Sequence, residues 1–252
     1  NQVWVDHGAV PVAHTGVLEE MKKYETGYFG NTPGRWEEAA KGRPDVAASK
    51  LKPPTVLFPK ELVFDDGKHR VELKHFGVAH THGDGWAWLP KERILFTGDA
   101  CVNGPYTYTG DGNIGEWIKT LEAAQKLKPK LVVPGHGAVS DASLLEDQRQ
   151  YFVTLRRHAQ RLRDRYKSPV EAAAQVDSIR AQMLKVDRIK RYIGDLFAVQ
   201  LEQAYVELGG MPFPPKMVLR SEARRQHAND HRLTLLDAPP LRGAKTARGD
   251  VR

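Results

Sequence analysis

The stretch AHTHGDGWAWLPKERILFTGD, residues 79–99, contains two apolar runs that are each bordered by residues able to bind a metal ion. The runs Gly85–Leu89 and Arg93–Thr97 flank the turn Pro90-Lys91-Glu92, as expected for two antiparallel strands. A Gly-containing turn with His or Asp lies at residues 79–84, and another at residues 96–99. The pattern therefore predicts a sheet with polar side chains at its rim.

The segments on either side of this stretch extend the sheet and cover it. Strand-like runs at Glu61–Asp65 and His69–Val78 are separated by Asp66-Gly67, a strong hairpin-turn signal. Residues Ile114–Leu127 have the spacing of an amphipathic helix, and Lys130–Val133 reads as a short buried strand. Strands with helices around them indicate an α/β chain of the α+β type, not a doubly wound parallel sheet.

A third rim turn follows that last strand, in Val132-Val133-Pro134-Gly135-His136-Gly137. The three rim turns present His80, Asp99 and His136 as candidate metal ligands. Glycine permits the tight turns, and the strands below hold the side chains rigidly. Imidazole and carboxylate donors suit zinc and, less selectively, iron or manganese. Each residue alone is more often an ordinary loop residue than a ligand, so the prediction depends on their combination.

The N-terminal region is predicted to contain both short strands and helices. Apolar runs at Gln2–Val5 and Val10–Ala13 indicate strands, and a helix is expected to begin at Thr15 as its N-cap. Residues Trp36–Leu51 contain helical patches that are interrupted at Gly42 and Pro44.

The C-terminal region is rich in Arg, Glu, Gln and Ala and is predicted to be helical. We expect helices at Leu144–Tyr166, Val170–Leu184 and Asp187–Leu208, the last ended by Gly209-Gly210.

Composition excludes several classes of protein. With 252 residues and 40% apolar content the chain can bury a substantial core, and its single cysteine excludes a Cys-rich zinc module. Of the net charge of +7, residues 216–252 supply +5, which predicts a weakly ordered basic tail and no nucleic-acid partner. No run is apolar over the roughly 18 residues that a membrane span needs. Oligomeric state and localisation, cytoplasmic or periplasmic, stay open.

Taken in order, these segments resemble the metallo-β-lactamase superfamily: a Gly-His-Thr-type turn, a strand pair, Phe-Thr-Gly-Asp, a helix and Val-Val-Pro-Gly-His-Gly. The resemblance implies an αββα sandwich with zinc at one edge, two ions per complete protein, and hydrolysis by a metal-activated water. It implies that His80 and His136 are zinc ligands and that Asp99 is the catalytic carboxylate bridging two metals. The expected organisation is a partial superfamily domain at 1–165, a helical extension at 166–210 and a basic tail at 211–252.

The signature His-X-His-X-Asp-His of this superfamily is absent from the sequence. Its place is expected just before residue 1, so we interpret the chain as truncated there and its sandwich as incomplete at the N-terminus. The histidines of Asp6-His7-Gly8 and His14 do not replace the motif, and both are expected to be solvated loop or helix-entry residues.

Further residues near the rim are candidates for contacts with substrate or with the ligands. These are His82, Asp84, Asn103 and Tyr106, with Tyr108 beside them. Asp84 has an equally strong interpretation as a turn residue. The tryptophans Trp86, Trp88 and Trp117 are expected in the core.

The sequence favours a zinc-dependent hydrolase of a small ester, thioester or amide substrate. Asp99 stands where the best-known zinc β-lactamases have a cysteine ligand, and Cys101 is displaced from that position. Two alternatives stay open: a non-catalytic binding protein of the same fold, and a mononuclear iron dioxygenase.

Overall fold

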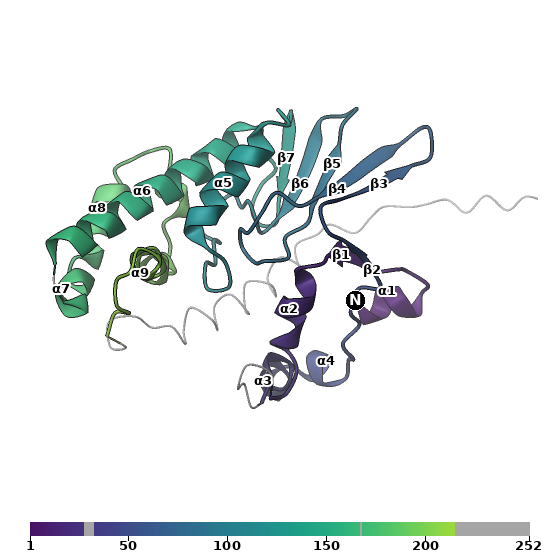
Figure 1. Ribbon diagram of the computed structural model, residues 1–252, viewed down its shortest axis with the longest axis horizontal. Helices are drawn as coiled ribbons and strands as arrows, with labels where there is room; N and C mark the ends of the chain where they lie inside the picture. Colours follow the sequence, from purple (N-terminus) through teal and green to yellow (C-terminus); the bar gives the residue numbers. More distant parts are fainter. Residues whose placement is uncertain (28–32, 167, 215–252) are drawn as a thin grey trace, which may run out of the picture.

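The protein is described by a computed structural model over residues 1–27, 33–166 and 168–214. A five-stranded sheet carries a layer of helices on one face, and a small two-stranded sheet with short helices lies to one side of it (Figure 1). The large sheet has the order β3-β4-β5-β6-β7. Its strands are β3 (Glu61–Asp65), β4 (Arg70–Lys74), β5 (Trp86–Leu89), β6 (Ile94–Gly98) and β7 (Leu131–Pro134).

The four strands predicted around residues 61–97 are confirmed, although β4 ends at Lys74, four residues before the predicted end at Val78. Strands β3 to β6 pair antiparallel in chain order, and β7 adds parallel to β6 after the helix α5 (Ile114–Gln125). The β3–β4 turn forms as expected, because Gly67 takes a φ of +82° and Asp66 Oδ1 accepts hydrogen bonds from the Lys68 and His69 backbone N–H groups.

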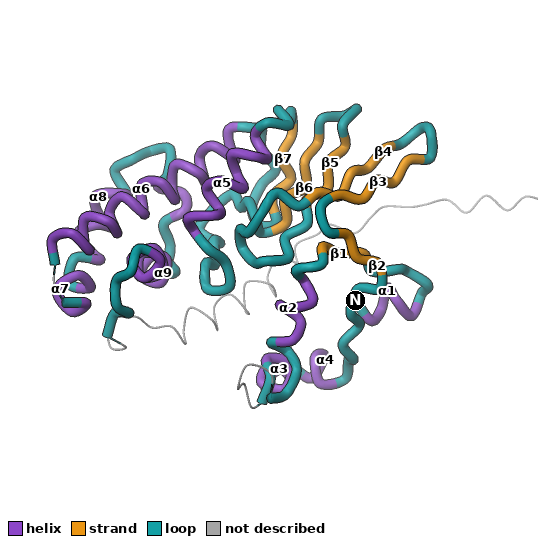
Figure 2. Tube along the Cα trace, in the orientation of Figure 1, coloured by secondary structure: helices purple, strands orange, loops and turns teal. Residues whose placement is uncertain are grey.

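Helices α5 and α6 (Ser143–Arg165) pack together beside the sheet, and α9 (Phe197–Glu207) packs on them farther from the strands, as Figure 2 also shows. Trp117 of α5 is fully buried there; its indole N–H donates to the Ala100 carbonyl at 2.8 Å and its ring packs on Phe152 at 4.8 Å. Trp86 and Trp88 are buried as well, which confirms all three predicted core tryptophans. The helices after residue 165 share this core.

The opposite face of the large sheet is also apolar, but much of it is accessible to water. Residues that pair directly on neighbouring strands point to the same face of a sheet. The register therefore arranges the residues of this face in two rows that cross the strands. We call this surface the open face; its residues are Leu62, Phe64, Val71, Leu73, Ala87, Leu89, Ile94, Phe96, Leu131 and Val133. Within the described residues, Phe64, Phe96 and Leu131 of this face count among the exposed large hydrophobic side chains.

The N-terminal region differs from the expectation at its first element. Residues Gln2–Asp6 form a helix, α1, where the sequence predicted a strand. Val3 and Trp4 are about 70% exposed, so no sheet face buries the apolar run, and a run this short does not distinguish strand from helix. Residues Val12–His14 form β1, which pairs parallel with β2 (Val56–Phe58).

The next helices follow the sequence more closely. Helix α2 covers Val17–Lys22, although Gly16 and not Thr15 is its N-cap. The interruption predicted at Gly42 and Pro44 separates α3 (Arg35–Gly42) from α4 (Pro44–Ala47).

Helix α6 confirms the first predicted C-terminal helix almost to the residue, but the two helices predicted after it are shorter and more broken. Residues Val170–Leu184 contain two helices, α7 (Pro169–Ala173) and α8 (Val176–Met183). The next expected helix contains a short 3₁₀ turn, η2 (Lys190–Tyr192), before α9 begins at Phe197.

The chain passes close to Pro105 just before α9, and a Cβ on Gly194 would lie 2.7 Å from the Pro105 Cβ, so this position favours glycine. Gly209 ends α9 with a φ of +86°, as predicted. None of the helices in residues 1–27, 33–166 and 168–214 is long and apolar enough to cross a membrane. The expected basic tail falls from residue 215 onward outside the described residues.

Candidate metal centre

Asp99 and His136 come together at the ends of the adjacent parallel strands β6 and β7. The Gly135 backbone N–H donates to the Gly98 carbonyl at 2.8 Å and so ties the two strand ends. The His136 Nε2 atom lies 3.5 Å from Asp99 Oδ1, with the His136 side chain only 7% exposed. Two of the three predicted ligands are therefore neighbours in the fold.

Glycines allow this close approach. A Cβ on Gly135 would lie 2.0 Å from Asp99 Oδ1, so any side chain at position 135 would clash with the carboxylate as it is placed here. Gly98 and Gly137 have φ values of +50° and +86°, in the region that favours glycine. The glycines of Gly-Asp and Gly-His-Gly thus not only indicate turns but are required by the backbone conformation and close packing of the site.

Tyr106 and Asn103 lie against the His136 turn. The Tyr106 ring stacks on the His136 imidazole, with centroids 5.4 Å apart and planes 29° apart. Gly104, at φ +145°, leaves the room that the Tyr106 ring occupies. The Asn103 side-chain amide donates to the Ala138 carbonyl at 2.8 Å. Both predicted residues therefore contact the His136 turn directly.

His80 lies in the first rim turn, with its ring near Tyr108 and Trp117 at centroid distances of 6.1 and 6.2 Å. Asp84 organises this turn: its carboxylate accepts from the Thr81 backbone N–H at 2.9 Å and from the Thr81 hydroxyl at 3.2 Å. Burial raises the pKa of Asp84 above its ordinary value. The turn interpretation of Asp84 thus agrees with its hydrogen bonds.

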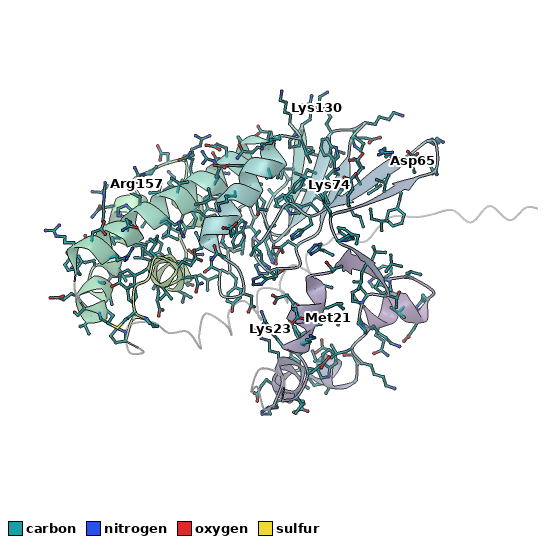
Figure 3. The ribbon with its side chains drawn as sticks, in the orientation of Figure 1. Met21, Lys23, Asp65, Lys74, Lys130 and Arg157 are labelled. Atoms are coloured by element: carbon teal, nitrogen blue, oxygen red, sulfur yellow. The ribbon has the colours of Figure 1, made fainter. Side chains whose placement is uncertain are left out.

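His82 faces the helix α2. Its side chain is 59% exposed, and Nδ1 lies 3.1 Å from Glu20 Oε1. Glu20 also pairs with Lys23, which Figure 3 shows at the end of α2. His82 therefore joins the first rim turn to the N-terminal region.

A second ionic contact ties the loop after Asp99 to that region. Lys23 and Arg35 both donate to the Asp111 carboxylate, Arg35 through two nitrogens at 2.7 and 2.9 Å. Burial opposes the ionisation of Asp111, but its bonds to Arg35 and the charges of Arg35 and Lys23 outweigh burial and hold its pKa below the ordinary value.

The N-terminal histidines stand apart from the Asp99–His136 pair. His7 is exposed and its Nδ1 lies 2.7 Å from the Val3 carbonyl, in agreement with a solvated role. For His14 the expectation was wrong, because this residue is buried: its Nδ1 accepts from the Gly16 N–H and its Nε2 donates to the Pro59 carbonyl. Pairing of β1 with β2, which the sequence does not reveal, buries this ring.

The described residues supply donors of the right chemistry for zinc, but they do not assemble a complete ligand set. Among them, no three His, Cys, Asp or Glu side chains are grouped closely enough to hold a metal ion. Structural and catalytic zinc sites use three or four protein ligands. Cys101 is fully buried, and burial raises the pKa of its thiol, so it does not extend the pair. The residues described thus do not fit zinc by themselves.

Sequence reasoning missed three residues that shape the site. His75 Nδ1 donates to the Asp84 carbonyl at 2.8 Å and supports the His80 turn. Arg191 reaches Asn103 and the buried Asp147, from which it is separated by 88 and 44 residues. The predicted strand His69–Val78 placed His75 in its interior, so the sequence gave no signal for this residue, and no local pattern indicated Arg191 or Asp147.

Sequence comparison identifies the class of protein. The profile of the metallo-beta-lactamase superfamily matches residues 1–136, more than half of the chain. The chain belongs to this superfamily.

Its relatives include the metallo-beta-lactamases type 2 of Bacillus cereus and of Bacillus sp. (strain 170), each 34% identical over 84 residues. These matches cover 31% of this chain, and the chain spans about a third of each relative, 33% of its length.

A solved structure supports the fold. The stereoselective inverting sec-alkylsulfatase Pisa1 from Pseudomonas sp. matches 93% of this chain and 46% of its own, with a TM-score of 0.56 and 16% identity. Together with the superfamily match, this structure confirms the mixed α+β fold expected from the sequence. The DIM-1 metallo-beta-lactamase is also similar, over 60% of this chain and 61% of its own, with a TM-score of 0.44 and 23% identity.

Proposed function

We propose that this chain belongs to a zinc-dependent hydrolase that cleaves a small ester, thioester or amide with a metal-activated water. Superfamily membership supports the general class, a metal-dependent hydrolase. The observation that carries the proposal is the 3.5 Å approach of His136 Nε2 to Asp99 Oδ1 at the ends of two paired strands. An imidazole and a carboxylate held this rigidly are suitable zinc ligands.

The proposal gives the residues distinct roles. His80, Asp99 and His136 are metal ligands, with Asp99 as the carboxylate that bridges two ions. Tyr106 and Asn103 fix the His136 turn, as their contacts indicate.

The His80 turn has supporting residues of its own. Asp84 orients it from within, and His82 lies at its outer edge toward α2.

Zinc binding by the chain itself tests the proposal. After zinc loading and dialysis, we would measure zinc by elemental analysis and its affinity by competition with a chromophoric chelator. Because the described residues bring two ligands together, we expect the chain to bind zinc weakly. Asp99→Asn and His136→Gln should each lower the zinc affinity by at least about tenfold, since removing a residue that only supports a ligand already costs about tenfold. Asp187→Asn, whose side chain is 93% exposed, is the matched control.

Hydrolysis of p-nitrophenyl esters, an acyl thioester and a small amide would then be compared with and without a chelator. Turnover that the chelator and Asp99→Asn both abolish supports the hydrolase. Zinc binding unaffected by Asp99→Asn would contradict the assigned site. Iron in place of zinc, with oxygen consumption, would indicate the dioxygenase.

A binding protein of the same fold is the second candidate, because the described residues hold no group of three metal-binding side chains. Absence of zinc binding in the unaltered chain would favour it and overturn the hydrolase, whereas weak zinc binding that Asp99→Asn reduces would contradict it.

A further inference from the structure

Asn103 braces the turn that carries His136 on both sides of Gly137. Its backbone N–H donates to the His136 carbonyl at 2.8 Å, and its side-chain Nδ2 donates to the Ala138 carbonyl at 2.8 Å. Gly137 has a φ of +86°, and a Cβ there would lie 2.0 Å from the Asn103 carbonyl oxygen. Asn103 and the His136 turn are therefore in tight backbone contact.

The remaining polar atom of the Asn103 side chain, Oδ1, is held by Arg191. Because only the NH₂ group can donate to the Ala138 carbonyl, the Asn103 Oδ1 atom must point the other way. There it accepts a hydrogen bond from Arg191 Nη1 at 3.1 Å. The Ala138 carbonyl and Arg191 thus together fix which way the Asn103 amide is turned.

A buried carboxylate on α6 anchors Arg191 in turn. Arg191 Nη2 donates to Asp147 Oδ2 at 2.6 Å, and Arg188 Nε donates to Asp147 Oδ1. The Asp147 side chain is only 7% exposed. A planar guanidinium can bond to both partners in one fixed orientation, which the single ammonium of a lysine cannot reproduce.

We infer that Arg191 is a positioning residue for His136. It orients Asn103, Asn103 holds the backbone at residues 136 and 138, and this backbone directs the imidazole toward Asp99. The C-terminal helical region is thereby coupled to the metal ligand. The inference deepens the proposed function and rests on it for the role of His136 as a ligand, but not for the contacts themselves.

The test compares Arg191→Lys and Arg191→Met with Arg188→Met. Arg188 supplies the matched control because it binds the same carboxylate, and in the described part of the chain it bonds to Asp147 and not to Asn103. The first readout is amide hydrogen exchange at Asn103 in the metal-free protein. Losing one charge-assisted hydrogen bond should speed exchange about tenfold in both Arg191 variants, with a much smaller change in Arg188→Met. Arg191→Lys keeps a charge beside Asp147, so it tests the geometry even if Arg191→Met unfolds.

The second readout is zinc affinity by chelator competition. We expect both Arg191 variants to bind zinc about tenfold more weakly, as for other outer-shell partners of a ligand, and Arg188→Met to bind normally. If Asn103 exchanges faster in the Arg191 variants but neither they nor the unaltered chain bind zinc, the positioning contact is supported and the proposed hydrolase is contradicted. Unchanged Asn103 exchange in Arg191→Lys, or equal effects of the Arg188 and Arg191 variants, would overturn the inference.

Discussion

The imidazole of His14 lies face to face with that of His75, with ring centroids 3.6 Å apart and planes 4° apart. His14 belongs to β1 in the N-terminal region, and His75 follows β4 and supports the turn of His80 through the Asp84 carbonyl. The stacked pair therefore connects the small sheet to the candidate metal centre.

This pair predicts a loss of stability in mild acid. Burial, and then the charge of His75, lower the pKa of His14 below its ordinary value. The folded state thus binds a proton at His14 less readily than the unfolded state does. The contribution of His14 to the free energy of unfolding is therefore complete above the unfolded-state pKa of about 6.5 and is lost as the pH falls below it. Urea unfolding at pH 7 and pH 5.5 should show lower stability at pH 5.5.

The variant His75→Asn should reduce the difference in stability between pH 7 and pH 5.5, because it removes the charge next to His14. The asparagine amide can still donate the hydrogen bond to the Asp84 carbonyl. His69→Asn is the control, since the His69 side chain is 67% exposed. A pH response as large in His75→Asn as in the unaltered chain would show that the stacked pair does not cause it.

Gly135→Ala should disturb the Asp99–His136 pair. The added Cβ would lie 2.0 Å from Asp99 Oδ1, so the carboxylate has to shift. We expect a destabilisation of about 1–3 kcal/mol, as for other overpacked sites, measured by urea unfolding. Gly42→Ala, where nothing lies within 4 Å, should leave stability unchanged or slightly raised. Equal unfolding midpoints for the two variants would contradict the close approach.

Glu207→Gln should destabilise the contact between α9 and α5. The Glu207 carboxylate accepts from the backbone N–H groups of Ile114 and Gly115 at 2.7 and 3.0 Å, and pairs with Arg156 while only 7% exposed. Removing the charge of a buried pair should lower the free energy of unfolding by about 3 kcal/mol. The half-exposed Glu116, changed to Gln, should cost under about 1 kcal/mol. Comparable losses in thermal or urea unfolding would show that Glu207 does not cap α5.

Two neighbouring residues of β6 should differ in their contribution to stability. Leu95 is fully buried beneath the helices, whereas Phe96 on the open face is 42% exposed. Leu95→Ala should lower the free energy of unfolding by about 3 kcal/mol. Phe96→Ala should cost about 1 kcal/mol, because much of its side chain already meets water. If Phe96→Ala costs as much as Leu95→Ala in urea unfolding, the open face is covered in solution.

Most of the large sheet and its main helices could be predicted from the sequence, because local patterns specify them. Strand-like runs and the Asp66-Gly67 turn predicted β3 and β4, amphipathic spacing predicted α5, and a composition rich in Arg, Glu, Gln and Ala predicted α6. The errors fall where packing overrides a weak local pattern. The apolar run Gln2–Val5 is largely exposed and lies in the helix α1, and a 3₁₀ turn at Lys190–Tyr192 interrupts the helix predicted over Asp187–Leu208.

The sequence by itself determined the superfamily, the strand order along the chain and the three rim turns with His80, Asp99 and His136, because each depends on residues close together in the chain. Only the tertiary structure decided that Asp99 and His136 adjoin, that His14 is buried against His75, and that Arg191 reaches Asn103. These contacts join residues far apart in the chain. They form only when strand pairing and the packing of α6 against the C-terminal segment bring the backbones together, and no local spacing records that geometry.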